Sequence, residues 1–356
     1  MIADSDLLVL STADVAAVLN DQELTLMDVV RDVYVAHASG QTVVPHSSFL
    51  RFPERPSDRI IALPAYLGSG GVAGIKWIAS FPENVAHGLD RASAVVILNA
   101  MATGRPYAVI EAALISAKRT AASAALATAH LLSDQPLRTI GLIGCGVISL
   151  ETLSFIHASQ PDLAEVVLFD TSEERARRLG SEWAERGHRH HIVVADSIDQ
   201  VLAGADVVTL ATTAAQPHIF DLSRCRPGAV VLHLSLRDIA PEALLELDNI
   251  TDDVDHVCRQ QTSLHLAEQA VGHRQFIRAT IGDILVGRAT ARDRRDAIVI
   301  FSPFGLGALD LGVAAWAVAR AREKGLGQLV SSFISKTGLP RVVPSERTMA
   351  PGGSRS

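Results

Sequence analysis

The chain has 356 residues, of which 48% are hydrophobic and 20% are charged, and its formal net charge is −7. This length and apolar content suit a large core divided between two domains. The acidic balance and the lack of a basic block exclude nucleic acid as an expected partner. No apolar run reaches the roughly 18 residues of a membrane span, and the first residues do not resemble a signal peptide.

The cysteines and histidines give no sign of a metal site. Cys145, Cys225 and Cys258 form an odd set without paired spacing, which is typical of a reducing compartment. We therefore expect a cytoplasmic protein without disulfides or a bound metal. The histidines within 188–191 are interpreted as part of a solvated loop.

The first 133 residues mix helical and strand patterns. Apolar residues recur at helical spacing over 12–38, and an alanine-rich helix is expected over 112–132, before a hinge at 134–136. Between the two helices, a hairpin turn is expected over 101–106. Strands are predicted at 43–52, 59–66, 74–80, 94–99 and 107–111.

From residue 137 the pattern changes to alternating strands and helices, which predicts a Rossmann-type, doubly wound parallel sheet in an α/β protein. An apolar helix over 308–322 is too hydrophobic to lie free on a surface, so we expect it to return to the first domain. The predicted strands are 138–143, 165–169, 192–195, 206–210, 229–234 and 297–301. The predicted helices are 147–158, 172–186 and 198–203.

These patterns divide the chain into a discontinuous α+β domain, residues 1–133 plus 308–338, and a Rossmann domain, residues 134–307. The segment 340–356 is rich in Pro, Gly, Ser and Arg, and we expect it to be a disordered tail.

The most informative motif is an apolar strand that runs into Gly144-Cys145-Gly146, with a helix from Val147. Gly144 permits a tight turn, and Gly146 lets the backbone approach a pyrophosphate. The helix then offers the free N–H groups of Val147 and Ile148. The motif predicts a bound dinucleotide.

Asp170 ends the second predicted strand of this domain, 24 residues after Gly146. An acidic residue in this place accepts hydrogen bonds from ribose hydroxyls and repels a 2′-phosphate, so NAD is predicted rather than NADP. Two alternatives stay open. Asp170 caps the following helix, or the nearby Arg175, Arg177 and Arg178 accommodate NADP.

Five segments together resemble the ornithine cyclodeaminase/mu-crystallin family, and the resemblance covers about residues 10 to 335. It implies that the first domain binds substrate and forms a homodimer, and that an NAD-binding Rossmann domain follows it. The five segments are 74–77, 103–106, 115–122, 144–148 and 301–311. Within the family, the chain is most similar to N-(2-amino-2-carboxyethyl)-L-glutamate dehydrogenases, through 58–66, 76–80, 91–99, 108–112 and 281–284.

The resemblance implies NAD-dependent oxidation at the amine-bearing carbon of N-(2-amino-2-carboxyethyl)-L-glutamate. The imine is then hydrolysed to 2-oxoglutarate and L-2,3-diaminopropionate, a precursor of siderophores or peptide antibiotics. Such chemistry needs cations for carboxylates, a base and a dry nicotinamide pocket. Other classes stay open: an ornithine or lysine cyclodeaminase, another amino-acid dehydrogenase or imine reductase, and a non-catalytic binding protein of the mu-crystallin type.

The resemblance also assigns roles in the first domain. Arg51, Lys76 and Arg119 match carboxylate-binding positions, and Lys76 is also expected to be catalytic. A surface charge is the alternative for Arg51. Glu111 is expected to hold the substrate ammonium group, or else to pair with a neighbouring lysine or arginine. Arg119 and Thr120 are expected at a cofactor phosphate, with a place in the helix interior as the alternative for Thr120.

In the Rossmann domain, Asp238 follows the predicted strand 229–234 and matches the family's catalytic aspartate, the expected base. A helix N-cap is its alternative. The resemblance places Ser235 and Leu236 at the nicotinamide pocket and Thr212 at the cofactor ribose.

One departure from the family bears on the substrate. Cyclodeaminases carry Gly-Lys shortly after the catalytic aspartate, whereas residues 239–242 read Ile-Ala-Pro-Glu and contain no lysine. The difference argues against ornithine cyclisation.

Overall fold

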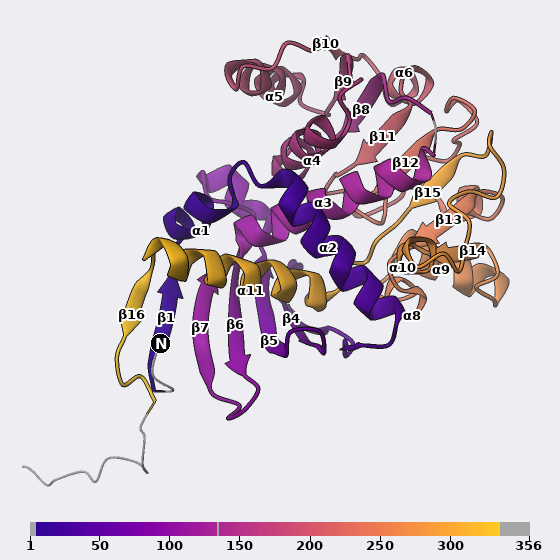
Figure 1. Ribbon diagram of the computed structural model, residues 1–356. Helices are drawn as coiled ribbons and strands as arrows, with labels where there is room; N and C mark the ends of the chain where they lie inside the picture. The colour runs from indigo at the N-terminus through magenta and orange to yellow at the C-terminus, as the bar shows by residue number, and fades with distance from the viewer. Residues whose placement is uncertain (1–4, 134, 335–356) are drawn as a thin grey trace, which may run out of the picture.

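The computed structural model describes residues 5–133 and 135–334. It contains two eight-stranded sheets, and helix α3 (Ala113–Leu131) packs against strands of both (Figure 1). The predicted α/β class with a Rossmann-type sheet is confirmed. The predicted tail over 340–356 and Asp134 of the predicted hinge lie outside the described residues.

The first sheet is mostly antiparallel, and the two ends of the described chain meet at its edge. β16 pairs antiparallel with β1, and β1 pairs parallel with β7. β3 (Ser48–Phe52) pairs with β4 outside the main strand order. That order is β16 (Gln328–Val330), β1 (Leu7–Leu10), β7 (Pro106–Glu111), β6 (Ala92–Ala100), β5 (Val72–Ser80), β4 (Arg55–Leu67) and β2 (Thr42–Val43).

Helices cover one face of this sheet and leave the other more open. α11 (Gly307–Lys324) contacts β4, β5 and β6, while α1 (Thr12–Leu19) contacts β1 and β7. Along β6, Val96 and Leu98 are fully buried on the helix side, whereas Val95, which precedes Val96, is exposed on the opposite side. This alternation is that of a sheet with one core face.

The second sheet is entirely parallel and runs in the order expected of a doubly wound fold. The chain reverses direction across the sheet between β8 and β11, where ligands bind at the carboxyl ends of strands. The order is β10 (His191–Val194), β9 (Glu165–Phe169), β8 (Thr139–Ile143), β11 (Val207–Leu210), β12 (Val230–His233), β15 (Val299–Phe301), β13 (Asp248–Thr251) and β14 (Ile277–Thr280).

Short and medium helices connect these parallel strands, as right-handed crossovers require. None of the helices in the described part of the chain is both long and apolar enough to cross a membrane. The connecting helices are α4 (Val147–Ser159), α5 (Glu173–Glu185), α6 (Ile198–Gly204), α7 (Pro241–Leu244), α8 (Val254–Val257), α9 (Ser263–Val271) and α10 (Ile281–Leu285).

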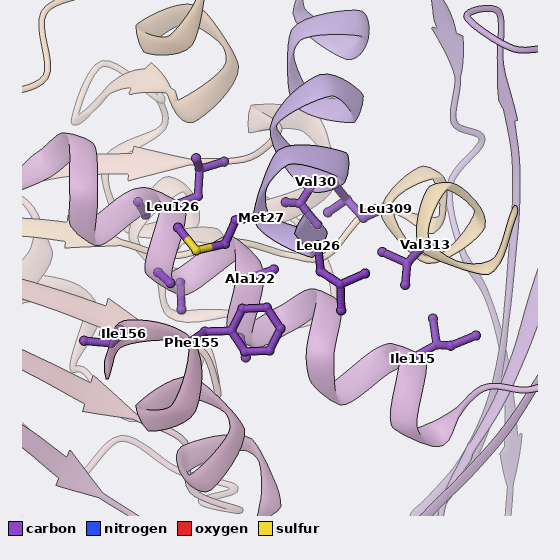
Figure 2. Close-up of a cluster of buried hydrophobic side chains, with 14 of the residues drawn as sticks. Leu26, Met27, Val30, Ile115, Ala122, Leu126, Phe155, Ile156, Leu309 and Val313 are labelled. Carbon is purple, nitrogen blue, oxygen red and sulfur yellow. The ribbon is translucent and has the colours of Figure 1, made fainter. Parts of the chain in front are cut away.

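A shared core joins the two halves through α3. Its small side chains, such as Ala122, let α2 (Glu23–Ala38) and α4 approach closely. In Figure 2, Leu26 and Met27 of α2 gather with Leu126 of α3 and Phe155 of α4. Since deleting a buried aromatic side chain costs about 3–5 kcal/mol, this junction is a main source of stability.

The predicted elements are largely confirmed, with corrections in the first half. The single helix predicted over 12–38 is wrong, because Asn20 leaves helical geometry and Asp21 adopts φ 59°, which separates α1 from α2. The strand predicted over 43–52 is two strands, β2 and β3, on either side of Pro45. Strands β1, β13, β14 and β16 were not predicted. The helix predicted over 308–322 is α11, which packs on the first sheet.

Candidate functional site

The glycine turn lies between β8 and α4 and has the geometry that a dinucleotide needs. Gly144 adopts φ 87°, and a Cβ there would lie 2.6 Å from the Ala211 carbonyl oxygen, so no other residue fits without strain. A Cβ on Gly146 would meet nothing within 4 Å. Gly146 caps α4 without a side-chain bond, which leaves the first N–H groups of the helix, from Val147 and Ile148, for a ligand.

Asp170 follows β9 directly and binds the glycine turn itself. Its carboxylate accepts hydrogen bonds from the backbone N–H of Cys145 at 2.8 Å and of Ser172 at 2.9 Å. The cap of α5 is Ser172, whose hydroxyl accepts from the Arg175 N–H, so Asp170 is not the helix N-cap. Arg175 lies 3.4 Å from the Asp170 carboxylate, while Arg177 pairs with Glu173 on the same helix.

A buried ion cluster occupies the space between the first sheet and its helices. Lys76 of β5 donates to Asp310 of α11 at 2.7 Å and to Ser116 of α3 at 3.2 Å. Arg119 of α3 donates to the other oxygen of Asp310 at 3.1 Å. Both Asp310 and the Lys76 side chain are almost fully buried, at 0% and 2% exposure. One carboxylate therefore fixes both predicted cations.

The cluster shifts the titration of its members. Burial lowers the pKa of Lys76 to about 8, helped by the charge of Arg119 and opposed by Asp310. Burial alone would raise the pKa of Asp310, but the two cations outweigh it, and the pKa is lowered. Lys76 thus titrates close to physiological pH, whereas Asp310 stays ionised.

Asp238 lies beyond the carboxyl end of β12, fully buried among hydroxyl groups. One of its oxygens accepts from the Thr212 hydroxyl, and the other contacts the Ser235 hydroxyl. His233 Nε2 lies 3.4 Å from the carboxylate and accepts the Asp238 backbone N–H at 3.2 Å. Burial alone would raise the pKa of Asp238, but the hydrogen bond and charge of His233, together with the Ser235 and Thr212 hydroxyls, outweigh it and hold the pKa at about 2.

The backbone between Ser235 and Asp238 is strained. Leu236 adopts φ 68°, a left-handed conformation that costs a non-glycine residue about 1–3 kcal/mol and concentrates at functional sites. The Leu236 carbonyl accepts the N–H of Ser263, which helps to hold this turn. Helix α7 begins at Pro241 with Ala240 as its cap, so the predicted alternative of an N-cap role for Asp238 is wrong.

The turn after β15 connects the surroundings of Asp238 with the ion cluster of Lys76, Arg119 and Asp310. Ser302 Oγ lies 3.2 Å from His233 Nδ1, and His233 contacts Asp238. Gly305 adopts φ 90°, and a Cβ there would lie 2.8 Å from an Arg119 nitrogen. The turn thus touches both the Asp238 surroundings and the Arg119 guanidinium.

The buried Asp252 holds this turn. Its carboxylate accepts from the Phe304 N–H at 2.8 Å and the Gly305 N–H at 2.7 Å. Asp252 and Asp310 were both missed from the sequence. The available signal for Asp310 was an acidic residue in the first turn of an otherwise apolar helix.

Three predicted site residues of the first domain lie apart from the ion cluster of Lys76, Arg119 and Asp310. Arg51 is exposed on β3, and its guanidinium donates to Gln260 Oε1 at 2.9 Å. The register of the sheet places Glu111 in one row with Val95, on the face opposite Lys76. Thr120 donates its hydroxyl to the Ser116 carbonyl within α3 at 2.7 Å, as its predicted alternative states.

Glu111 keeps one free carboxylate oxygen. Its Oε1 accepts the Ala113 N–H at 2.6 Å at the start of α3, and its Oε2 is buried without a hydrogen-bond partner in the described structure. Lys118 pairs instead with Glu151 at 3.0 Å, and Arg119 with Asp310. The predicted alternative, in which Glu111 pairs with a neighbouring cation, is therefore wrong.

Comparison with known proteins identifies the family. The model of the ornithine cyclodeaminase/mu-crystallin family matches residues 6–325. The chain belongs to this family. Its similarity to relatives extends over nearly the whole chain. N-((2S)-2-amino-2-carboxyethyl)-L-glutamate dehydrogenase of Staphylococcus aureus is 27% identical over 335 residues, which cover 92% of this chain and 99% of that protein.

Solved structures of family members have the same fold. An archaeal alanine dehydrogenase dimer with bound NAD has a TM-score of 0.82 at 25% identity, covering 92% of this chain and 99% of that one. The Δ1-pyrroline-2-carboxylate reductase of Thermococcus litoralis, in complex with NADH and L-proline, has a TM-score of 0.84 at 22% identity, covering 90% and 99%. The prediction of an NAD-dependent oxidoreductase acting on amino-acid derivatives agrees with these members of the ornithine cyclodeaminase/mu-crystallin family.

Proposed function

We propose that the chain is an NAD-dependent oxidoreductase that cleaves N-(2-amino-2-carboxyethyl)-L-glutamate into 2-oxoglutarate and L-2,3-diaminopropionate, for siderophore or peptide-antibiotic synthesis. The observation that carries this proposal is the turn at 302–305. Gly305 in this turn lies against Arg119, which shares Asp310 with Lys76, and Ser302 contacts His233 beside the ionised Asp238. The similarity to the dehydrogenase of Staphylococcus aureus supports the choice of substrate.

The residues around the glycine turn fit NAD. The space at Gly146 and the free N–H groups of Val147 and Ile148 suit a pyrophosphate. Asp170 at the end of β9 suits a ribose. When bound, NAD⁺ accepts a hydride from the substrate carbon.

Further residues are proposed to complete the cofactor site on its nicotinamide side. Thr212, Ser235 and Leu236 follow β11 and β12, at the edge where ligands of such sheets bind. For the predicted phosphate contact, Arg119 is proposed through its terminal nitrogens near Gly305, whereas the Thr120 hydroxyl is bonded within α3.

Lys76 and Arg119 are proposed to bind the carboxylate on the reacting carbon. Arg119 uses only its Nε for Asp310, so its terminal N–H groups remain for a carboxylate. Lys76 supplies a point charge in a buried setting, where an ion pair is stronger than in water. Arg51 of β3 is proposed to bind a further carboxylate of the substrate. Glu111, on the sheet face opposite Lys76, is proposed to offer its unpaired Oε2 to the diaminopropionate ammonium group.

Asp238 is proposed to act mainly through its charge. A carboxylate with a pKa of about 2 is a weak base, but it stays ionised and preorganised by its hydroxyl neighbours. It would therefore stabilise the positive charge that develops on the substrate nitrogen as the carbon–nitrogen bond becomes double. This role needs no stored proton.

A homodimer is proposed through the open face of the first sheet. Two neighbouring rows on this face are mostly apolar and incompletely buried, and large apolar patches on one face mark interfaces. The archaeal alanine dehydrogenase is itself a dimer. A Trp77→Glu substitution should lower the dimer mass seen by light scattering. The rows are Ala62, Trp77, Val95 and Glu111, and Pro64, Ile75, Ile97 and Val109.

The proposed activity is tested by a substrate screen with NAD⁺ that follows NADH absorbance and identifies the organic products. NADH and 2-oxoglutarate in equal amounts from N-(2-amino-2-carboxyethyl)-L-glutamate are expected. Proline from ornithine without net NADH would instead identify a cyclodeaminase. Binding of amines without turnover of any of them would identify a binding protein.

A further inference from the structure

Four arginines from separate parts of the chain gather beside the candidate site; we call Arg51, Arg59, Arg91 and Arg237 the arginine cluster. Arg51 of β3 lies directly opposite Arg59 of β4 in the antiparallel register. Directly opposite residues on adjacent strands have Cβ atoms about 4.5–5.5 Å apart. The first two members of the cluster are therefore neighbours by backbone geometry.

The other two arginines join this pair through shared partners. Arg91 donates to Ser80 Oγ at 3.0 Å, and Ser80 lies opposite Arg59 on β5. Arg237, from the loop after β12, donates to the Gln260 carbonyl at 2.6 Å. Arg51 donates to the side chain of the same glutamine. The cluster thus bridges the first sheet and the Rossmann half.

No ion pair neutralises the cluster within the described residues, although the charge of Asp238 opposes the lowering of the Arg237 pKa by burial and by Arg51. Among residues 5–133 and 135–334, no carboxylate forms an ion pair with any of the four. Of the acids adjacent in sequence to members of the cluster, Asp58 pairs with Arg55, and Asp238 is bonded to hydroxyl groups. The exposed Asp90 forms no ion pair with Arg91. Burial lowers the pKa of Arg59, and the charges of the other three arginines lower it further.

Such an arrangement is unfavourable without an anion. Arginine stays protonated at physiological pH, so four positive charges persist together, three of them partly buried and that of Arg51 exposed. Partly buried charges of one sign repel one another more strongly than charges in water. The chain as a whole is acidic, with a net charge of −7, so the concentration of arginine here is local. Guanidinium groups match carboxylates in a bidentate fashion.

The arginine cluster lies beside the proposed catalytic residue Asp238. Arg237 immediately precedes Asp238, and the strained Leu236 sets the direction of the chain just before it. Lys76 and Arg119, which both pair with Asp310, are already proposed to bind the carboxylate on the reacting carbon of the substrate. The cluster is a second, separate group of cations beside the same site.

We propose that the arginine cluster binds the side-chain carboxylate of the glutamate part of the substrate, with Arg59, Arg91 and Arg237 as specificity-determining residues. This inference rests on the proposed function and adds the substrate class: an amine with at least one carboxylate beyond the one on the reacting carbon. A substrate with a single carboxylate, such as alanine, proline or ornithine, would leave the four charges uncompensated.

The test compares two 2-oxo acids of equal length as ligands of the protein loaded with NADH. 2-Oxoglutarate carries the second carboxylate, and 2-oxopentanoate has a methyl group in its place. The wild type should bind 2-oxoglutarate roughly 10- to 100-fold more tightly, as charged hydrogen bonds of this kind provide. Arg59→Gln, Arg91→Gln and Arg237→Gln should each reduce this ratio and leave 2-oxopentanoate binding unchanged.

Arg31→Gln is the matched control, since Arg31 is an exposed arginine of α2 paired with Asp28. It should keep the wild-type ratio. In the dehydrogenase assay, the three cluster variants should raise KM for the amine by roughly 10- to 100-fold and change kcat much less. Retained NADH binding shows that a variant is folded, and any one folded cluster variant is enough for the test.

The outcomes separate this inference from the proposed function. Equal binding of the two acids by the wild type, or a wild-type ratio in every folded cluster variant, would overturn it. If the dehydrogenase assay fails but the cluster-dependent preference for 2-oxoglutarate holds, the substrate class stands and the proposed reaction does not. If the assay succeeds with wild-type KM in all cluster variants, the reaction stands and the inference fails.

Discussion

The two halves of the molecule place their functional residues in different ways. In the Rossmann half, the glycine turn, Asp170 and Asp238 all follow the carboxyl ends of parallel strands, so the backbone alone brings them to one edge. In the first half, Lys76 and Arg119 come from a strand and a helix and are fixed by the buried Asp310 of α11. Local topology thus determines the cofactor side, and long-range ion pairs determine the substrate side.

If the Rossmann half supplies the charge for catalysis, Asp238→Asn should have the largest effect. We expect kcat to fall roughly 10²- to 10⁴-fold, because the amide cannot stabilise positive charge on the substrate nitrogen. NADH binding, followed by fluorescence, should change little. Glu242→Gln, an exposed neighbour on α7, is the control and should have normal kcat. A normal kcat in Asp238→Asn would remove this residue from the mechanism.

If the substrate side depends on one buried carboxylate, Asp310→Asn should destabilise the fold. The variant leaves Lys76 and Arg119 without their counter-charge, and breaking a buried pair costs about 3–5 kcal/mol. Urea unfolding measures the loss. Asp28→Asn breaks an exposed pair with Arg31 and should cost under about 1 kcal/mol. Equal losses of unfolding free energy in the two variants would show that the buried ion cluster stabilises the fold no more than an exposed ion pair.

Substitutions at the two glycines of the turn should affect different properties: fold stability at Gly144 and cofactor binding at Gly146. Gly144→Ala forces a side chain onto φ 87° and against Ala211, so we expect a loss of about 1–3 kcal/mol in unfolding free energy. Gly146→Ala meets open space and should cost under about 1 kcal/mol. It should still weaken NADH binding, because the methyl group fills the space proposed for the pyrophosphate. Unchanged NADH affinity in Gly146→Ala would place the cofactor elsewhere.

The two halves should also differ in pH dependence. Lys76 binds a carboxylate only when protonated, and its pKa is lowered to about 8. Below that pH the charge is present, so kcat/KM should be flat there and fall about tenfold for each pH unit well above it. Asp238, with a pKa of about 2, should add no acid limb above pH 4 or so. A rise in kcat/KM through pH 8 would instead assign Lys76 the role of a base.

The sequence was sufficient for the cofactor side of the Rossmann half because strand, turn and acidic residue lie close together in the chain, whereas β13 and β14 at the far edge of the sheet were not predicted. Its predicted strands agree with the structure to within one or two residues. It was not sufficient for the ion cluster, because Asp310 is 234 residues away from Lys76, and an acidic residue in the first turn of a helix does not indicate which cations it will pair with. The arginine cluster was not predicted either, because its members are also far apart in the sequence. Cross-strand register and a distant loop bring them together.

Local propensity also failed where a single residue interrupts a continuing pattern. Apolar spacing runs unbroken through 12–38, yet Asp21 in a left-handed conformation divides the segment into two helices. The short strands β1 and β16 are stabilised by pairing with each other across the two ends of the described chain, and β1 also pairs with β7. Neither has a strong pattern of its own. Tertiary contacts therefore decide these elements.

The most direct test of this division of roles uses N-(2-amino-2-carboxyethyl)-L-glutamate deuterated at the α-carbon of its glutamate part, with NAD⁺ and the wild-type protein. We expect the deuterium to move to the reduced cofactor and one 2-oxoglutarate to form for each reduced cofactor. Deuterium retained in the organic product, or amine consumption without reduced cofactor, would contradict it.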